Sequence, residues 1–237
     1  MRVVGSKEDP NLAILLPVVT ALEELCDSLV FVGGCATGLL ITTERAQVIR
    51  ATKDVDVIAQ VASIAKYHQI EKQFVSKGFQ HDVSEDAPIC RWVKDGLLID
   101  LMPSEKGILG FHNRWYPLAL KTAERVRLPN GTEINLISAP VFVATKLEAF
   151  RDRGNSDILA SHDLEDIISV IDGRDELLKE IEESDKELRE YIADQFKLLF
   201  SMTDFEYALP GHLPGDAASQ ARLPDLLSKL KLLAGVG

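Results

Sequence analysis

The segment DVDVIAQ, residues 54–60, alternates acidic and apolar side chains at its start, and a period of two residues is typical of a β-strand. Side chains at positions i and i+2 of a strand point to the same face, so Asp54 and Asp56 project together, roughly 7 Å apart along the chain. Val55 and Val57 then pack on the other face. Two interpretations stay open from this segment alone: the acids form the solvated face of an edge strand, or they bind a divalent cation.

A second apolar segment precedes this strand and ends in a glycine pair. LVFVGG, residues 29–34, is typical of a short buried strand, and the apolar pattern from Cys35 to Leu40 predicts a helix directly after it. The start of such a helix accepts anions, because its N–H groups are free and Gly33 and Gly34 carry no Cβ to block the approach. Glycine pairs are also common turn signals, so this pair does not by itself distinguish a phosphate site from a plain turn.

Further helices and strands follow from the same patterns. The dipeptides Asp95-Gly96 and Asn130-Gly131 each predict a tight hairpin turn with positive φ angles. Apolar side chains that recur every three or four residues predict helices, and short apolar or alternating runs predict strands. The helices are expected over residues 12–30 and 61–77, and the strands over 79–83, 89–93 and 97–102.

One acid stands inside an apolar segment. LLIDLM, residues 97–102, carries Asp100 between apolar neighbours, where a carboxylate is costly unless it is paired, hydrogen-bonded or bound to a metal. If this strand lies beside residues 54–60, three carboxylates converge. Such a set suits Mg²⁺, which takes oxygen ligands, and two ions roughly 3.5–4 Å apart can stabilise both oxygens of an in-line phosphoryl displacement.

The pattern changes after Pro140, where charged helical segments replace the strands. We therefore predict a mixed α/β fold, with a sheet domain over residues 1–138 and a helical domain over residues 139–237. Residues 208–224, rich in proline and glycine, predict a loop that leads into a short terminal helix. The other helices of this half are expected over 141–153, 157–172 and 174–200.

The composition is that of an ordinary globular protein with an acidic excess. The 237 residues carry a formal net charge of −11, which opposes bulk attraction to nucleic-acid phosphates. Three cysteines without CxxC spacing indicate neither a disulfide framework nor a zinc site. The first apolar run is shorter than the roughly 20 residues of a membrane span, and no signal-peptide pattern precedes it. We expect a cytoplasmic protein with no membrane partner.

The ordered set of these segments resembles a known family. FVGG, then TKDVDVI, then LLIDLM is similar to the signature of the polymerase-beta-type nucleotidyltransferase superfamily. The wide spacing between the glycines and the first acid, together with RATKDVDV, KLEAFRDRG and SHDLEDI, resembles its AbiEii-like branch. That branch contains the nucleotidyltransferase toxins of type IV toxin–antitoxin systems. The resemblance covers roughly residues 30–170.

The resemblance implies an enzyme with a nucleotidyltransferase-type mixed sheet flanked by helices. It would move a nucleoside monophosphate from an NTP to an acceptor hydroxyl with Mg²⁺ or Mn²⁺ as cofactor, and Asp100 would also help deprotonate that hydroxyl. Its residues, carried over by position, are Asp54, Asp56 and Asp100 at the metal ions, Gly33 and Gly34 around the nucleotide phosphates, Lys146 reaching those phosphates, and Asp163 and Asp166 as the D-x-x-D helix motif.

The residues of the helical half also allow purely structural roles. Lys146 can be an exposed helix lysine near Glu148 or a lysine that only orients its neighbours, and Asp163 and Glu165 can be surface acids. Asp166 can pair with an arginine, Arg151 or Arg153, of the preceding helix.

The match has one departure. Where many members of the superfamily have a serine that contacts the phosphates, this chain has Gly34 followed by Cys35. Backbone amides, Thr37 or Thr52 can take over that contact.

The acceptor stays open between tRNA, a protein and a cationic small molecule, and the acidic charge favours the last two. As a toxin, the chain would also have a cognate antitoxin protein as its partner. The alternatives are a catalytically inactive protein of the same fold that binds nucleotide or a partner, and a plain scaffold that docks a partner through its charged helices. A tRNA acceptor would require a basic groove, for which the candidates are Arg45, Arg50, Lys53, Arg91, Lys94 and Arg114.

Overall fold

The computed structural model describes residues 1–6, 8–43, 49–61, 63–110, 112–153 and 157–236. They form two compact units: Met1–Leu39 with Ala51–Ser138, and Leu40–Arg50 with Ala139–Gly237. The predicted domains, residues 1–138 and 139–237, stay a prediction, because compactness alone does not show which part folds by itself. The predicted groove residue Arg45 lies outside the described residues.

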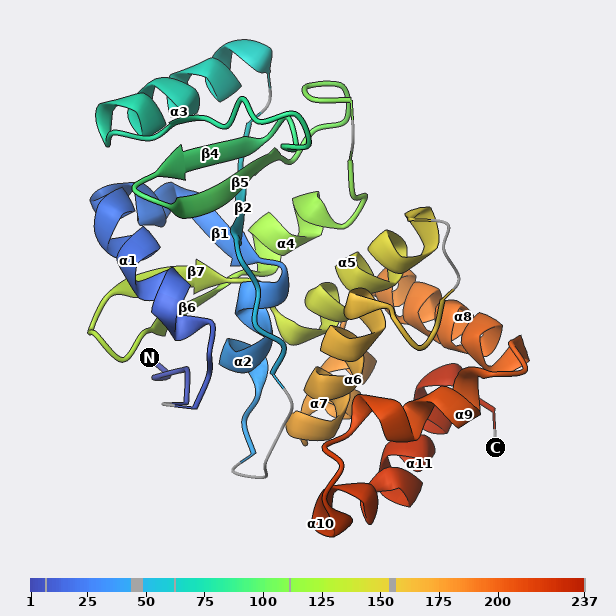
Figure 1. Ribbon diagram of the computed structural model, residues 1–237. Coiled ribbons are helices and arrows are strands. Elements are labelled where there is room, and N and C mark those ends of the chain that lie inside the picture. Colours follow the sequence, from blue (N-terminus) through green and yellow to red (C-terminus); the bar gives the residue numbers. More distant parts are fainter. Residues whose placement is uncertain (7, 44–48, 62, 111, 154–156, 237) are drawn as a thin grey trace. The chain divides into compact units, whose positions relative to one another are not determined.

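The first unit is built on a mixed, open sheet of seven strands among the described residues (Figure 1). The expected mixed α/β class is therefore confirmed. Across the sheet the strands run β3, β4, β5, β2, β1, β7, β6. Their bounds are β1 Leu29–Val32, β2 Val55–Ala59, β3 Gln80–His81, β4 Arg91–Lys94, β5 Leu97–Pro103, β6 Glu124–Arg127 and β7 Glu133–Leu136.

The strand that carries the acid pair is central. β2 pairs antiparallel with β1 and parallel with β5, and β1 pairs parallel with β7. Val55 and Val57 are fully buried, as the alternating pattern predicted. The interpretation of residues 54–60 as an edge strand is wrong, because this strand has a partner on each side.

Helices and aromatic side chains cover this sheet. The Tyr67 hydroxyl donates a hydrogen bond to the backbone oxygen of Leu101 at 2.8 Å, and the Phe74 ring packs on Trp92 with 5.4 Å between ring centroids. These contacts fix α3 against β4 and β5. The helices of this unit are α1 Leu12–Leu22, η1 Glu23–Ser28, η2 Gly34–Ala36, α3 Ile64–Ser76 and α4 Tyr116–Thr122, and α2, Thr37–Leu40, follows η2.

One helical expectation for this unit differs from the structure, and one helix was not expected. The helix expected over residues 12–30 ends at Leu22, where Glu23 takes a positive φ of 52° and the chain tightens into a 3₁₀ turn. The sequence patterns gave no indication of α4, which begins next to Pro117. A proline near the first position of a helix is favourable and was the available signal.

The two predicted hairpin turns fold differently. Asp95 and Gly96 both have positive φ angles, 49° and 82°, so the tight two-residue turn is confirmed. At the second turn only Gly131 has a positive φ, 88°, and the backbone N–H of Leu128 donates to the oxygen of Thr132. The expectation of positive angles at both Asn130 and Gly131 is wrong, because the chain instead makes a longer loop that needs one left-handed residue.

The second unit is helical, and two of its expected helices are shortened by local hydrogen bonds. Asp157 accepts from the backbone N–H groups of Leu159 and Ala160, which holds a turn before α6. Arg189 donates to the backbone oxygens of Glu182 and Ser184, which stabilises the break between α7 and α8. The helices are α5 Ala139–Asp152, α6 His162–Gly173, α7 Leu177–Glu182, α8 Lys186–Ser201, α9 Phe205–Ala208, η3 Leu209–His212, α10 Ala217–Gln220 and α11 Leu223–Ala234.

The loop expected over residues 208–224 contains short helices, one of them α10, which Asp216 caps through the N–H groups of Ala218 and Ser219. Among the helices of the described residues, none has the length and apolar character needed to cross a membrane.

Candidate functional site

The three predicted metal acids of the first unit lie on two neighbouring strands. In the parallel pairing of β2 with β5, Asp56 stands directly beside Asp100, and Asp54 immediately precedes β2. Asp100 is 7% exposed, whereas Asp54 and Asp56 are partly exposed. The strand register therefore brings a buried and two half-buried carboxylates to one place on the sheet, as the sequence predicted if the strands were neighbours.

Arg91 joins two of these acids. Its Nε donates to Asp100 Oδ1 and its Nη2 to Asp100 Oδ2, each at 2.8 Å, and Nη2 also donates to Asp54 Oδ2. The hydrogen bonds to Asp100 raise the pKa of Arg91, so the guanidinium stays charged. Asp100 thus satisfies the expectation that an acid in this strand needs a partner, and the partner in this structure is an arginine.

The sequence patterns predict Arg91 only as a groove residue, although the sequence also contains a signal for its position beside Asp100. The confirmed turn at Asp95-Gly96 pairs Lys94 with Leu97, and the same antiparallel register places Arg91 opposite Asp100. Directly opposed cross-strand residues have Cβ atoms about 5 Å apart, which is within reach of an arginine–carboxylate pair.

The glycine pair lies against the same acids. Gly33 has φ 68°, and a Cβ at this position would overlap the carboxylate of Asp56. Strands β1 and β2 are antiparallel, and Val32 at the end of β1 is the register partner of Asp56 near the start of β2. The turn after β1 therefore lies beside the start of β2. Glycine is therefore required here both for its backbone angle and for the space that Asp56 takes.

Asn11 ties this turn to the segment before β2. Its side-chain oxygen accepts from the N–H of Thr52 at 2.9 Å, and its amide donates to the oxygen of Gly34 at 3.5 Å. The Thr52 hydroxyl in turn donates to Asp54 Oδ1 at 2.7 Å. Asn11 is 1% exposed and gave no signal in the sequence, because its partners are distant along the chain.

The remaining side chains of the glycine turn are buried. The Cys35 thiol donates to the backbone oxygen of Val32 at 3.2 Å, and Thr37 is fully buried. Thr52 is bonded to Asp54, so neither threonine presents a free hydroxyl on the surface. Burial, with the charges of Asp100 and Asp56, raises the pKa of Cys90 to about 12, so this neighbouring thiol stays protonated.

Lys146, Asp163 and Asp166 form a separate cluster inside the second unit. Lys146 Nζ donates to Asp166 Oδ2 at 2.6 Å and to Asp163 Oδ1 at 3.2 Å. Arg50 donates to the same oxygen of Asp166 at 3.3 Å, and Arg153 donates to Asp163 Oδ2 at 2.8 Å. The two acids share a face of α6, because they are three residues apart, and α5 supplies the lysine.

This geometry overturns three structural alternatives for these residues. Lys146 is 8% exposed and Asp163 is 2% exposed, so neither is a surface residue. Asp166 pairs with Lys146 and Arg50, whereas Arg153 pairs with Asp163 and Arg151 with Asp152. The predicted contact of Lys146 with nucleotide phosphates stays a prediction, and its ammonium group here forms ion pairs with two buried acids.

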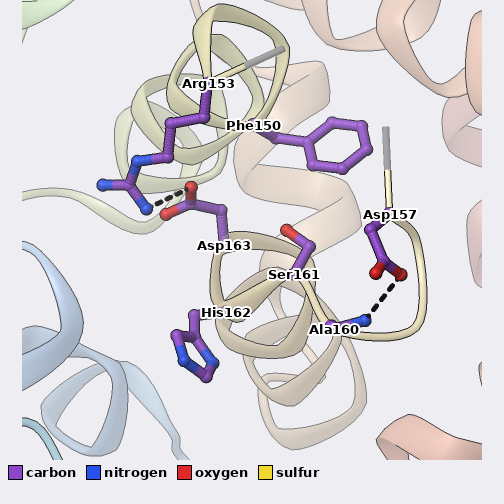
Figure 2. A pocket seen from close by; sticks show the side chains of 7 residues that line it. All are labelled: Phe150, Arg153, Asp157, Ala160, Ser161, His162 and Asp163. Carbon is purple, nitrogen blue, oxygen red and sulfur yellow. Dashed lines mark hydrogen bonds and ion pairs between the residues drawn. The ribbon is translucent and has the colours of Figure 1, made fainter. Parts of the chain in front are cut away.

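A cavity of about 370 Å³ lies beside this cluster in the second unit. Figure 2 shows Arg153 and Asp163 paired at one side of it and Asp157 bonded to the backbone of Ala160 at another. Its walls are Phe150, Arg153, Asp157, Ala160, Ser161, His162 and Asp163. A second cavity, of about 340 Å³, lies in the first unit beyond the carboxyl ends of β2 and β5, whereas Asp54 lies at the opposite end of β2.

The predicted basic groove has little support in the described residues. Lys94 donates to the backbone oxygen of Lys77 at 2.6 Å, and the guanidinium of Arg114 stacks over the Trp115 ring at 5.2 Å. Arg91 is engaged by the acids, and Arg50 belongs to the second unit. Lys53 is exposed.

Comparison with known proteins adds no family. No protein-family model matches the chain, and a search of curated proteins finds no significant match. The resemblance to nucleotidyltransferases therefore rests on the motifs of this chain alone.

The Gly33 turn can be tested by adding a single methyl group. We expect Gly33→Ala to lower the free energy of unfolding by about 1–3 kcal/mol more than Gly131→Ala does, because only the first methyl group overlaps a carboxylate. Gly131 is a matched control, since its φ is also positive and a Cβ there meets nothing within 4 Å. Urea unfolding followed by circular dichroism measures both, and equal losses would contradict the close approach of Asp56.

We expect substitution of Lys146 to cause a large loss of stability, because its ammonium group pairs with two buried acids. Lys146→Ala leaves the carboxylates of Asp163 and Asp166 with less compensating charge in a buried place, which costs about 3–5 kcal/mol. Lys186→Ala is the control, because its side chain is 78% exposed and its loss should change stability by less than about 0.5 kcal/mol. Denaturant unfolding compares the two, and a Lys146 variant as stable as the Lys186 variant would rule out the buried cluster.

Proposed function

We propose that this protein is a metal-dependent nucleotidyltransferase that moves a nucleoside monophosphate from an NTP to an acceptor hydroxyl, with pyrophosphate as the leaving group. The observation that carries the proposal is the meeting of Asp54, Asp56 and Asp100 beside the Gly33 turn. A sheet that serves only as a scaffold gains nothing from three neighbouring carboxylates, one of them buried. The nucleotidyltransferase-type arrangement of the sheet and the AbiEii-like affiliation are parts of the same proposal.

The donor chemistry of these acids fits Mg²⁺ or Mn²⁺. All the available ligand atoms are carboxylate oxygens, the kind that hard divalent cations prefer. The Arg91 guanidinium already occupies a cation position between Asp54 and Asp100, which marks where positive charge is favourable. As the side chains stand, no three Asp, Glu, His or Cys residues of the described chain are arranged to hold a metal ion. Arg91 donates to oxygens of Asp54 and Asp100 that a cation would use as ligands.

The roles of the chain's own groups follow from their positions. Asp54 and Asp56 would hold the cation, and Asp100, the most buried of the three, would complete the set and help take the proton of the acceptor hydroxyl. Gly33 and Gly34 would offer backbone N–H groups to the nucleotide phosphates, since the space left by the missing Cβ of Gly33 is taken by Asp56. The bound cation would supply the charge that stabilises the leaving pyrophosphate.

The charge of the chain bears on the acceptor. A net charge of −11 favours a protein or a cationic small molecule over tRNA, because long nucleic acids bind through arginine and lysine. Two of the basic groove candidates, Arg91 and Lys94, are engaged within the protein. The proposal also includes a toxin that modifies tRNA and is controlled by an antitoxin. In that case tRNA is the acceptor, and it is the less favoured acceptor class.

A second candidate function is a catalytically inactive protein of the same fold that binds a nucleotide or a protein partner. The observation that favours it is the Arg91 pairing, which gives Asp54 and Asp100 a counter-ion from the chain itself. The two functions differ in whether the protein transfers a nucleotide.

Transfer of label decides between the two functions. The whole chain is incubated with each α-³²P-labelled NTP, Mn²⁺ or Mg²⁺, and either cell extract or total tRNA. We expect label to enter a protein or small-molecule fraction, and we expect Asp56→Asn to reduce the transfer about 100-fold or more, because a ligand of the cation is lost.

Asp86→Asn is the control for this assay, since Asp86 is an exposed acid of the same unit outside the cluster. Its rate should equal that of the unchanged protein. If no NTP gives transfer while nucleotide still raises the melting temperature, the inactive binding protein is supported and the enzyme is excluded.

A further inference from the structure

The contacts of Arg91 use the same oxygen atoms that a cation would need. Its guanidinium group donates hydrogen bonds to both carboxylate oxygens of Asp100, and Nη2 also donates to one oxygen of Asp54. The side chains are sheltered, with 19% of Arg91, 25% of Asp54 and 10% of Asp100 exposed. A guanidinium and a divalent cation cannot share these positions, because they compete for the same lone pairs and repel each other.

We infer that Arg91 is the internal counter-ion of this acid cluster, and that a divalent cation binds Asp54 and Asp100 only by displacing it. The inference rests on the proposed function and adds that cation binding is coupled to the displacement of Arg91. The displaced guanidinium needs a new anionic partner, since an unpaired charge near the protein interior is unfavourable. Nucleotide phosphates supply such a partner, so cation and nucleotide bind cooperatively, whereas the cation alone binds weakly.

The position of Arg91 in the sheet suits this exchange. It is the first residue of β4, and the antiparallel register keeps its backbone opposite Asp100 whatever its side chain does. An arginine side chain has several rotatable bonds, so the guanidinium can leave the carboxylates while the strand stays in place. Arg91 is therefore a positioning residue that sets the affinity of the acids for the cation.

Cation binding measured without any turnover tests the inference. Mn²⁺ binding to the whole chain is followed by the electron paramagnetic resonance signal of the free ion, with and without an α,β-methylene NTP analogue. We expect Arg91→Gln to bind Mn²⁺ alone about tenfold more tightly than the unchanged protein, because the fraction of molecules with open carboxylates rises. The analogue should tighten Mn²⁺ binding more in the unchanged protein than in Arg91→Gln.

Arg125→Gln controls for the change in net charge, since Arg125 pairs with Asp27 and Glu133 on another part of the same unit. Its Mn²⁺ affinity should equal that of the unchanged protein. Where Arg91→Gln does not fold by circular dichroism, Arg91→Lys replaces it, because lysine keeps the charge and loses the two-pronged contact. Its affinity should lie above that of the unchanged protein.

The outcomes separate the inference from the proposed function. If the unchanged protein binds Mn²⁺ and the Arg91 variant binds it no more tightly, the inference is wrong. The proposed enzymatic function is not affected by that result. Absence of Mn²⁺ binding in every variant, with and without the analogue, overturns both. A purely structural Arg91 would give lower affinity on substitution, through disorder of Asp100, and that result also overturns the inference.

Discussion

The register of β2 between β1 and β5 is the constraint on which the candidate site depends. It sets Asp56 beside Asp100 on one neighbour and opposite Val32 on the other, so the acids and the Gly33 turn meet. A shift of one residue would turn Asp56 towards the side where Val55 and Val57 are buried. The fully buried valines therefore keep the acids in place, because the cost of exposing them holds the register.

In both units, the buried acids of the predicted site have a cation within hydrogen-bonding distance. Asp100 has Arg91, and in the other unit Asp163 and Asp166 share Lys146. The two clusters differ in kind. The helical cluster has two buried acids and a buried lysine, whereas the sheet cluster joins buried Asp100 to Asp54 and Arg91, which are partly exposed. The sheet cluster is thus the one suited to exchanging its counter-ion.

Much of the first unit could be predicted, because period-two alternation and the Asp95-Gly96 turn act over short stretches of chain. The Asp157 turn and the break held by Arg189 were missed, since side chains that bond the nearby backbone can interrupt an apolar pattern without changing it. For the site, the sequence indicated which acids could meet. It did not indicate Asn11, whose contacts depend on the tertiary fold.

The central claim, that Asp54, Asp56 and Asp100 bind divalent cations, is tested most directly by anomalous diffraction from crystals grown with Mn²⁺ and a non-hydrolysable NTP. The result expected is a Mn²⁺ peak within about 2.0–2.4 Å of carboxylate oxygens of these acids, with the guanidinium of Arg91 moved away from Asp100. Crystals with bound nucleotide, no peak at the acids and Arg91 still bonded to Asp54 and Asp100 would contradict it.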